Sequence, residues 1–160
     1  YNPILKMGQE SFIKECTLSD VDGIILPDLP LEEAKEFCDM SKASKISPIL
    51  LVAPNSSKER IKKISELAGD LIYAVSILGI TGNELSSKTK LERYLNRVRE
   101  SSQTPFVVGF GISTREDVKW FNKHSDGAVV GSAIIEKLTT SREIKLSIKN
   151  YLRSLKGKID

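Results

Sequence analysis

The sequence has few of the residues that mark disulfide-rich, metal-binding or membrane-spanning proteins. Its 160 residues include two cysteines and one histidine, with no Cys-x-x-Cys pair. The longest apolar runs, around residues 24–26 and 48–52, are far too short to span a bilayer, and no signal or transit segment is expected. We therefore expect Cys16 and Cys38 to be free, reduced thiols and the protein to be cytoplasmic.

A large excess of one charge is also missing. The net charge is +3, and lysines are mixed with glutamates, as in residues 58–63. Such mixing is typical of a solvated helix face, so a nucleic-acid-binding surface is not indicated. No Gly-x-Gly-x-x-Gly or Walker loop occurs, which argues against a dinucleotide or nucleoside triphosphate site. The remaining composition, 40% hydrophobic and 28% charged, is that of an ordinary globular protein.

A repeated order of strand, turn and helix runs along the chain. Apolar strands are predicted at residues 21–26, 48–53, 71–76, 105–108 and 127–130. Amphipathic helices are predicted at residues 8–18, 31–43, 56–69 and 90–99, after residue 113, and from residue 141. Pro30 is expected to open its helix, and Ser56 with Glu59 has the pattern of a capping box. Apolar strands that alternate with helices indicate an α/β fold with a parallel sheet covered by helices.

The predicted fold is part of a barrel. Five strands cannot close an eight-stranded barrel. However, (βα)8 barrels typically bind phosphate after their last two strands, and this chain has glycine turns after its last two predicted strands, at residues 109–111 and at residue 131. We therefore predict that residues 1–160 form one domain, the C-terminal portion of an incomplete (βα)8 TIM barrel. The chain starts at Tyr1 without methionine, and residues 1–5 have the pattern of a strand end that enters a loop. We accordingly expect the natural N-terminal segment to be missing.

Two glycine turns carry the strongest functional signal. Residues 107–111 and 129–131 are β-branched runs that stop at glycine and are followed by serine. Ser113 with Glu116 has the spacing of a capping box, which predicts a helix start. A new helix offers unpaired N–H groups and the positive end of its dipole, and glycine permits close approach of a ligand. One such turn could be an ordinary connection, but two in consecutive units predict a cradle for a dianionic phosphate.

Several short segments stand out by their order along the chain. They are Tyr1-Asn2-Pro3-Ile4, Ile25-Leu26-Pro27-Asp28-Leu29-Pro30, Ala53-Pro54-Asn55, Gly79-Ile80-Thr81-Gly82, Gly109-Phe110-Gly111-Ile112-Ser113 and Gly131-Ser132-Ala133-Ile134. In this order they resemble the tryptophan synthase α chain family, from Tyr1 to the last helix. The resemblance implies a (βα)8 barrel that cleaves indole-3-glycerol phosphate by retro-aldol chemistry, releasing indole and glyceraldehyde 3-phosphate in tryptophan biosynthesis. It also implies a β chain carrying pyridoxal phosphate, in an α2β2 assembly, and no cofactor or metal in this chain.

The resemblance also implies four groups of site residues. The substrate phosphate would be bound by Gly82, Gly111, Gly131 and Ser132. The indole ring would lie among Ile25, Leu51, Tyr73, Phe110 and Val129, although ordinary barrel packing would also explain these apolar residues. Gly79 and Thr81 would belong to a lid loop. Contacts with the β chain would involve Asn2, Asp28 and Pro30, for which simple turn roles are equally open.

The acid–base pair that this reaction needs is not recognisable in the chain. By resemblance, a glutamate and an aspartate would lie upstream of Tyr1. Asp28 is the only carboxylate expected at a strand C-terminus, so residues 1–160 alone are predicted to be inactive. Two other functions remain open. One is a catalytically silent module that activates a pyridoxal-phosphate-dependent β subunit, and the other is a phosphate-binding barrel lyase or isomerase with a different substrate.

Overall fold

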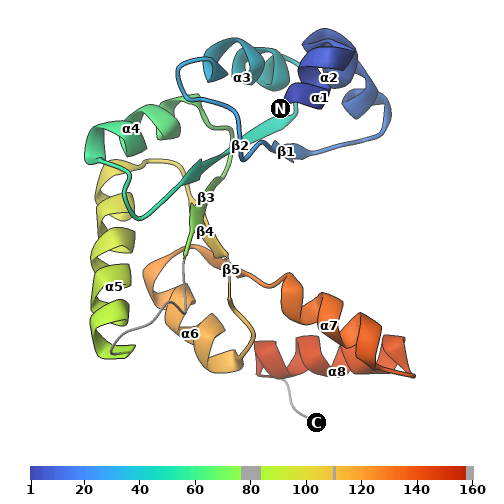
Figure 1. Cartoon of the computed structure of the whole chain (residues 1–160), viewed down its shortest axis with the longest axis vertical. Helices are drawn as coiled ribbons and strands as arrows, with labels where there is room; N and C mark the ends of the chain where they lie inside the picture. Colours follow the sequence, from blue (N-terminus) through green and yellow to red (C-terminus); the bar gives the residue numbers. More distant parts are fainter. Residues whose placement is uncertain (77–83, 110, 158–160) are drawn as a thin grey trace.

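One curved parallel sheet forms the centre of the protein (Figure 1), which a computed structural model describes at residues 1–76, 84–109 and 111–157. Its strands are β1 (Gly23–Ile25), β2 (Ser47–Val52), β3 (Ile72–Val75), β4 (Phe106–Gly109) and β5 (Gly127–Val129). They lie in the order β1-β2-β3-β4-β5, and each is parallel to the next. Within the described residues, β1 and β5 are the edges of the sheet. All five predicted strands are confirmed, with small shifts at their ends.

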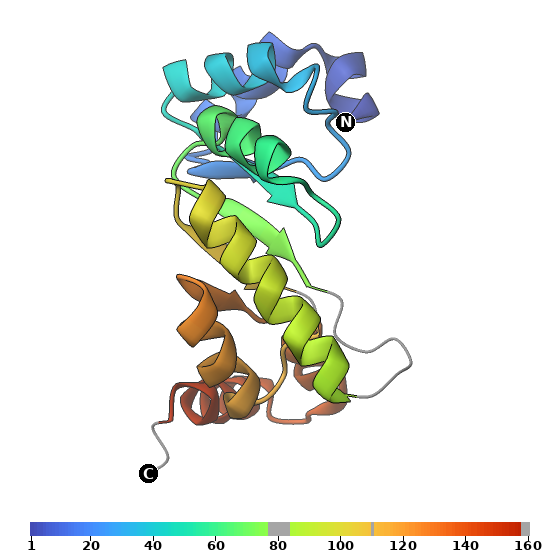
Figure 2. The same cartoon turned by 90° about the vertical axis from the view of Figure 1, so that its left-hand side faces the viewer.

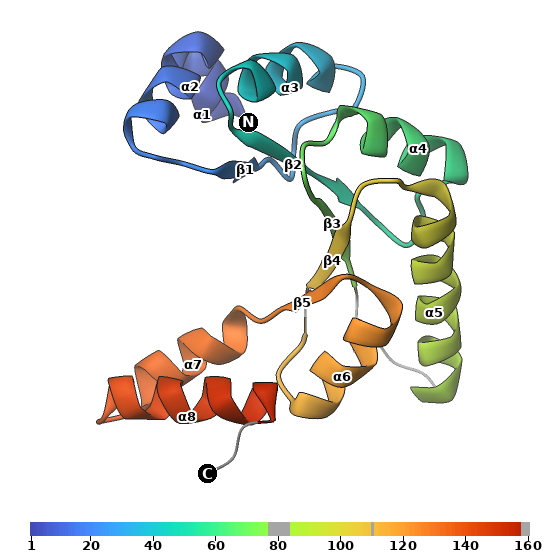
Figure 3. The ribbon, with the colours of Figure 1, turned by 180° about the vertical axis from the view of Figure 1, so that it is seen from behind.

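Two helices precede the first strand, and at least one helix follows each of the five strands. They are α1 (Asn2–Met7), α2 (Gln9–Leu18), α3 (Ala34–Ala43), α4 (Lys58–Leu67), α5 (Glu84–Ser101), α6 (Arg115–His124), α7 (Ser132–Thr140) and α8 (Ile144–Lys156). Figure 2 shows α4 and α5 in front of the sheet. Seen from behind in Figure 3, α1 and α2 lie beyond β1 at one end, and α7 and α8 lie beyond β5 at the other. This α/β order is the one that the sequence predicts.

The two faces of the sheet differ in burial. Alternate strand residues are buried beneath the helices and form the main core: Leu50, Val52, Ile72, Ala74, Phe106 and Val108. The residues between them point to the concave side, because successive side chains of a strand face opposite ways. On that side Ile25 is 47% exposed and Val129 is 36% exposed. The strands therefore present an apolar concave surface as well as an apolar core face.

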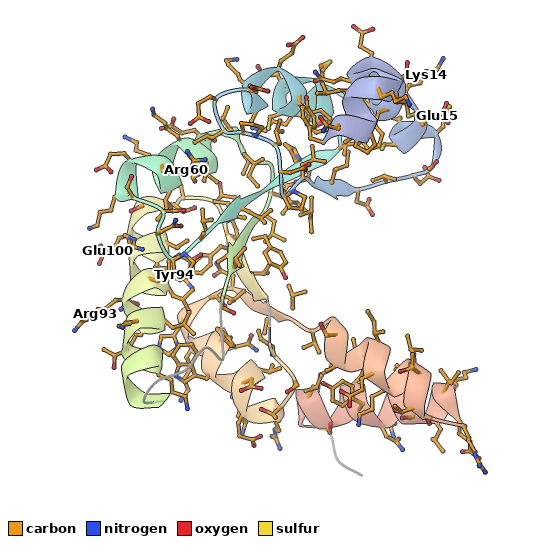
Figure 4. The ribbon with its side chains drawn as sticks, in the orientation of Figure 1. Lys14, Glu15, Arg60, Arg93, Tyr94 and Glu100 are labelled. Carbon is orange, nitrogen blue, oxygen red and sulfur yellow. The ribbon has the colours of Figure 1, made fainter. Side chains whose placement is uncertain are left out.

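Tyr94 connects α5 to the sheet. Its phenol donates a hydrogen bond of 2.8 Å to the Val52 carbonyl, and both groups are buried. Burial raises the pKa of the Tyr94 phenol, which therefore stays protonated and able to donate. Figure 4 shows Tyr94 on the side of α5 that faces the sheet, whereas Arg93 points away from it. This bond holds the long helix against β2.

A smaller core joins the first three helices near β1. It contains Ile4, Ile13, Cys16, Phe37 and Ile46. Both cysteines are free and buried, which confirms the prediction of unpaired thiols, and burial raises the pKa of each. Among the residues that the structure describes, no helix is both long enough and apolar enough to cross a membrane.

The first and third helices differ from the prediction. Residues 1–5 were expected to end a strand, but Asn2–Met7 is a helix with Pro3 in its first turn. Proline is tolerated there because the first N–H groups of a helix have no acceptor within it. Pro30 does not open α3, since a hydrogen-bonded turn follows it and the helix begins only at Ala34. At the first place a helix replaces the expected strand end, and at the second the helix begins at Ala34 instead of at Pro30.

The start of α4 is displaced by one residue. Ser57, not Ser56, is the N-cap, and its hydroxyl accepts a hydrogen bond of 3.2 Å from the Arg60 N–H. The Ser56 hydroxyl instead accepts from the Ala53 N–H at 3.0 Å, inside the preceding turn. Adjacent serines made both assignments possible from the sequence, and the path of the turn decides between them.

Candidate functional site

The carboxyl ends of β4 and β5 bring the two glycine turns together. Gly109 pairs with Val129 across these strands, so the turns that follow them are neighbours. Between the turns lies a pocket of about 340 Å3, lined by Tyr73, Gly111, Ile112, Ser113, Val129, Gly131, Ser132, Ala133 and Glu136. Three of the four predicted phosphate-binding residues and two of the five predicted ring-binding residues are in this set. A larger cleft of about 620 Å3 lies between α4 and α5 and is lined by polar and mixed-charge surface side chains.

The start of α7 has the geometry of an anion site. Gly131 is its N-cap and provides no side-chain cap for the helix that begins at Ser132. The N–H groups of Ser132 and Ala133 have no acceptor within the helix. Both residues line the pocket. A Cβ added to Gly131 would meet nothing within 4 Å, so the fold leaves open space beside this glycine. Unpaired N–H groups, the helix dipole and open space together suit an anion.

The start of α6 differs from the prediction and leaves fewer N–H donors for a ligand. The capping box is Thr114 with Asp117, each one residue later than the expected Ser113 with Glu116. The Asp117 carboxylate accepts hydrogen bonds from the Ser113 N–H at 3.2 Å and the Thr114 N–H at 2.9 Å. These two donors are therefore engaged within the protein. On this side the pocket is lined instead by the turn at Gly111, whose φ of 74° lies in the left-handed region that favours glycine.

Hydrogen bonding also sets the charge of Asp117. Burial alone would raise its pKa, but hydrogen bonds from Thr114 and Ser113 outweigh burial and hold the pKa below its ordinary value. Asp117 therefore remains ionised at neutral pH, and its carboxylate stays hydrogen-bonded to the N–H groups of Ser113 and Thr114.

Tyr73 covers Gly109 at the wall of the pocket. A Cβ added to Gly109 would overlap the Tyr73 hydroxyl, so only glycine lets this ring take its place. Tyr73 also lines the pocket, and burial raises the pKa of its phenol. Gly109 thus supports the position of a predicted ring-binding residue rather than contacting a ligand itself.

The other predicted ring-binding residues lie along the concave face or outside the description. Leu51 pairs with Tyr73 on the next strand and is half-buried. Ile25 lies on the edge strand β1 and is not part of the pocket lining. Phe110 lies outside the described residues, as do Gly79, Thr81 and Gly82 of the predicted lid and phosphate loop.

The three residues predicted to contact a β chain are exposed. Asn2 is the first residue of α1, while Asp28 and Pro30 lie in the segment between β1 and α3. The Asp28 carboxylate lies against the backbone nitrogen of Tyr1. The contact brings Asp28 close to the start of α1, so two of the three residues share one region of the surface.

Two residues of the site were missed from the sequence. Glu136 lines the pocket, although it lies four residues beyond Ser132 and outside the glycine motif. Tyr151 of α8 donates a hydrogen bond of 2.7 Å to the Ser113 carbonyl. The i,i+4 spacing could have placed Glu136 on the same helix face as Ser132. No local signal indicates the contact of Tyr151, since it joins segments 38 residues apart.

The chain has consecutive strand–helix units and a pocket at the carboxyl ends of β4 and β5. This arrangement is that of a (βα)8-barrel protein. A comparison with known families specifies the kind of barrel. The chain belongs to the tryptophan synthase α chain family, whose profile matches residues 1–158.

Individual relatives agree with this assignment. The α chain of Petrotoga mobilis is 40% identical over 160 residues, which cover 98% of this chain and 62% of the relative. That of Methanocaldococcus jannaschii is 45% identical over 136 residues, covering 85% and 48% respectively. The solved tryptophan synthase α2β2 complex from Pyrococcus furiosus matches with a TM-score of 0.86 at 34% identity, over 98% of this chain and 64% of that one. The chain therefore spans less than two thirds of the length of these relatives.

Proposed function

We propose that the chain forms the phosphate- and ring-binding part of a tryptophan synthase α subunit, a lyase that cleaves indole-3-glycerol phosphate to indole and glyceraldehyde 3-phosphate in tryptophan biosynthesis. The observation that carries the proposal is the shared pocket of Gly111, Gly131 and Ser132. These are the positions for which family membership implies phosphate binding. All three residues line one pocket, so they could contact the same phosphate group.

Backbone donors would hold the phosphate. The first-turn N–H groups of α7 and the Ser132 hydroxyl supply donors at one wall of the pocket, and the turn at Gly111 forms another wall. A hydrogen bond to a charged group contributes about 1.5–3 kcal/mol. Three such bonds would retain an anion without a lysine or arginine in the lining.

The ring would lie on the apolar side of the same pocket. Tyr73 and Val129 line it, and Leu51 continues the apolar surface beside Tyr73. A flat heteroaromatic ring binds well against such an apolar surface, with the phosphate of the same substrate at the glycine turns. The ring and phosphate positions are therefore adjacent, as one substrate carrying both groups requires.

The acid–base step needs groups beyond this pocket. Retro-aldol cleavage requires an acid for the ring carbon and a base for a hydroxyl proton. Among the described carboxylates near the pocket, Asp117 is engaged by backbone N–H groups, and Glu136 lies one helical turn from Ser132. We therefore expect residues 1–160 to bind the substrate and, alone, not to cleave it.

A partner completes the proposed function. We infer that the chain acts in the cytoplasm in an α2β2 assembly, with a β chain that carries pyridoxal phosphate, while this chain binds no cofactor. The solved complex from Pyrococcus furiosus supports the assembly. Asn2, Asp28 and Pro30 are the proposed contacts, because all three are exposed and Asp28 lies close to the start of α1.

Ligand-dependent stability tests the proposal. Indole propanol phosphate, a substrate analogue, should raise the melting temperature of the purified protein, because a ligand that binds only the folded state stabilises it. Gly131→Asp should abolish the increase by placing a carboxylate in the cradle. Asn122→Asp adds the same charge at an exposed position of α6 and should leave the increase intact. Absence of any increase in the unmodified protein would refute the substrate assignment.

The same preparation distinguishes a catalytically silent module. If the protein binds the analogue and increases turnover of a β chain with serine and indole, but releases no indole from indole-3-glycerol phosphate, the role is activation of the partner. Release of indole by the assembled protein would instead establish the lyase.

A further inference from the structure

We propose that Glu136 determines which anions the pocket accepts, because its carboxylate opposes a dianionic phosphate and favours ligands of lower charge. The inference rests on the proposed phosphate site and concerns a residue outside the glycine motif. Glu136 is the only residue with a formally charged side chain in the described lining of the pocket. Backbone dipoles would attract an anion into this pocket, whereas the Glu136 carboxylate would repel it.

Helix geometry directs Glu136 toward the ligand. Ser132 and Glu136 are four residues apart in α7 and therefore lie on one face of the helix. Side chains of a helix lean toward its N-terminus. Glu136 accordingly lines the same pocket as Ser132 and Ala133 of the first turn. The same first turn supplies the donors of the proposed cradle.

The charges around Glu136 leave this repulsion in place. Its carboxylate and that of Asp117 both raise the pKa of the Tyr151 phenol, after the larger effect of burial, which places both negative charges near the wall that Ser113 forms. The neighbouring cation, Lys137, lies over the ring of Tyr151 with Nζ 5.8 Å from the ring centroid and is not in the pocket lining. Lys88 helps to lower the pKa of Asp117 and so acts on that carboxylate. Within the described lining, Glu136 therefore carries the charge that acts directly on a ligand.

This arrangement predicts selectivity by charge. Repulsion from a fixed carboxylate is about twice as large for a dianion as for a monoanion at the same position. Glu136 would thus weaken retention of a phosphate monoester and favour its release, while a singly charged ester would be affected less. Backbone donors would bind the phosphate, and repulsion from the Glu136 carboxylate would limit the affinity for it.

Binding measurements on the purified protein test this. Glycerol 3-phosphate serves as the dianionic probe and glycerol 3-sulfate as the monoanionic probe, both titrated by calorimetry at pH 8. Glu136→Gln should tighten binding of the phosphate by about two- to fivefold, and of the sulfate by less, as expected for removal of a solvent-exposed repulsion. Glu136→Lys should tighten phosphate binding further. The gain should shrink as salt is raised from low to physiological concentration, because ions screen a Coulombic effect.

A matched variant separates local charge from net charge. Glu143→Gln removes the same charge from an exposed residue, the N-cap of α8, whose side chain makes no capping hydrogen bond. Glu143 is not in the described pocket lining. This variant should leave both affinities unchanged. Equal phosphate binding in the unmodified protein and Glu136→Gln would overturn the inference and leave the phosphate site standing. If neither protein nor variant binds phosphate, the site and the inference both fail.

Discussion

The Tyr151 phenol donates a hydrogen bond of 2.7 Å to the carbonyl of Ser113 and so joins α8 to the turn before α6. On the other side of that turn, the Asp117 carboxylate accepts from the Ser113 N–H. One residue of the pocket wall is therefore held through both of its backbone groups. This wall of the pocket is therefore in contact with α8, a helix that contributes no residue to the described lining.

Removal of this contact should loosen the pocket. Tyr151→Phe keeps the ring and deletes the donor, so we expect a loss of about 1 kcal/mol in the free energy of unfolding and a few-fold weaker binding of glycerol 3-phosphate. Denaturant unfolding and calorimetry measure the two effects. Tyr1→Phe serves as a comparison on the opposite edge of the sheet, where no effect on phosphate binding is expected. Unchanged affinity in Tyr151→Phe would show that the turn keeps its shape without α8.

Two pocket glycines should respond differently to alanine. Gly131 has space for a Cβ, so Gly131→Ala should leave the melting temperature nearly unchanged while the methyl group reduces phosphate affinity. Gly111→Ala places a side chain at a φ of 74° and should cost about 1–2 kcal/mol of stability. Thermal unfolding with and without glycerol 3-phosphate separates the two behaviours. A strongly destabilised Gly131→Ala protein would contradict the open space seen beside that residue.

Gly109 and Tyr73 should be energetically coupled. Gly109→Ala forces the Tyr73 ring to move, and overpacking of this kind costs about 1–3 kcal/mol. The overlap involves the hydroxyl oxygen and the ring carbon that bears it. Tyr73→Phe removes the first of these and should recover part of that loss in the double variant. A double-mutant cycle of unfolding free energies measures the coupling, and strict additivity would argue against the contact.

The position of the capping box can be tested directly. Thr114→Ala should cost about 1 kcal/mol because it removes the hydroxyl that accepts from the Asp117 N–H. Ser113→Ala, at the cap that the sequence suggested, should have little effect. Urea unfolding of the two variants distinguishes the arrangements, and the reverse ranking would support the original assignment.

Acid pH should weaken the same cap. The pKa of Asp117 is lowered in the folded state, so its ionised form stabilises the fold at neutral pH, and this contribution is lost as pH falls through the folded-state pKa. Between about pH 5 and pH 2, the unmodified protein should therefore lose more stability than Asp117→Asn. Melting temperatures across this range measure the difference, and parallel curves would mean that the carboxylate charge is not used.

Much of the fold was predictable because its signals are local. The runs around Leu50, Ile72 and Val108 are apolar over strand-like lengths, and each is followed by a helical pattern, so the alternating order was evident. Helix starts were less predictable. Ser56 and Ser57 are adjacent, as are the Ser113–Glu116 and Thr114–Asp117 pairs, and either member satisfies the spacing of a cap.

Residue types at short spacing were enough to predict the strand–helix repeat, the family, and the glycines at the ends of β4 and β5. The three-dimensional fold was needed to show that the Ser113 N–H is already engaged, that Glu136 lines the pocket, and that Tyr151 contacts Ser113. Those outcomes depend on partners brought together by strand pairing and helix packing. A capping hydroxyl or a carboxylate has several acceptors or donors within reach along the chain, and the packed fold selects among them.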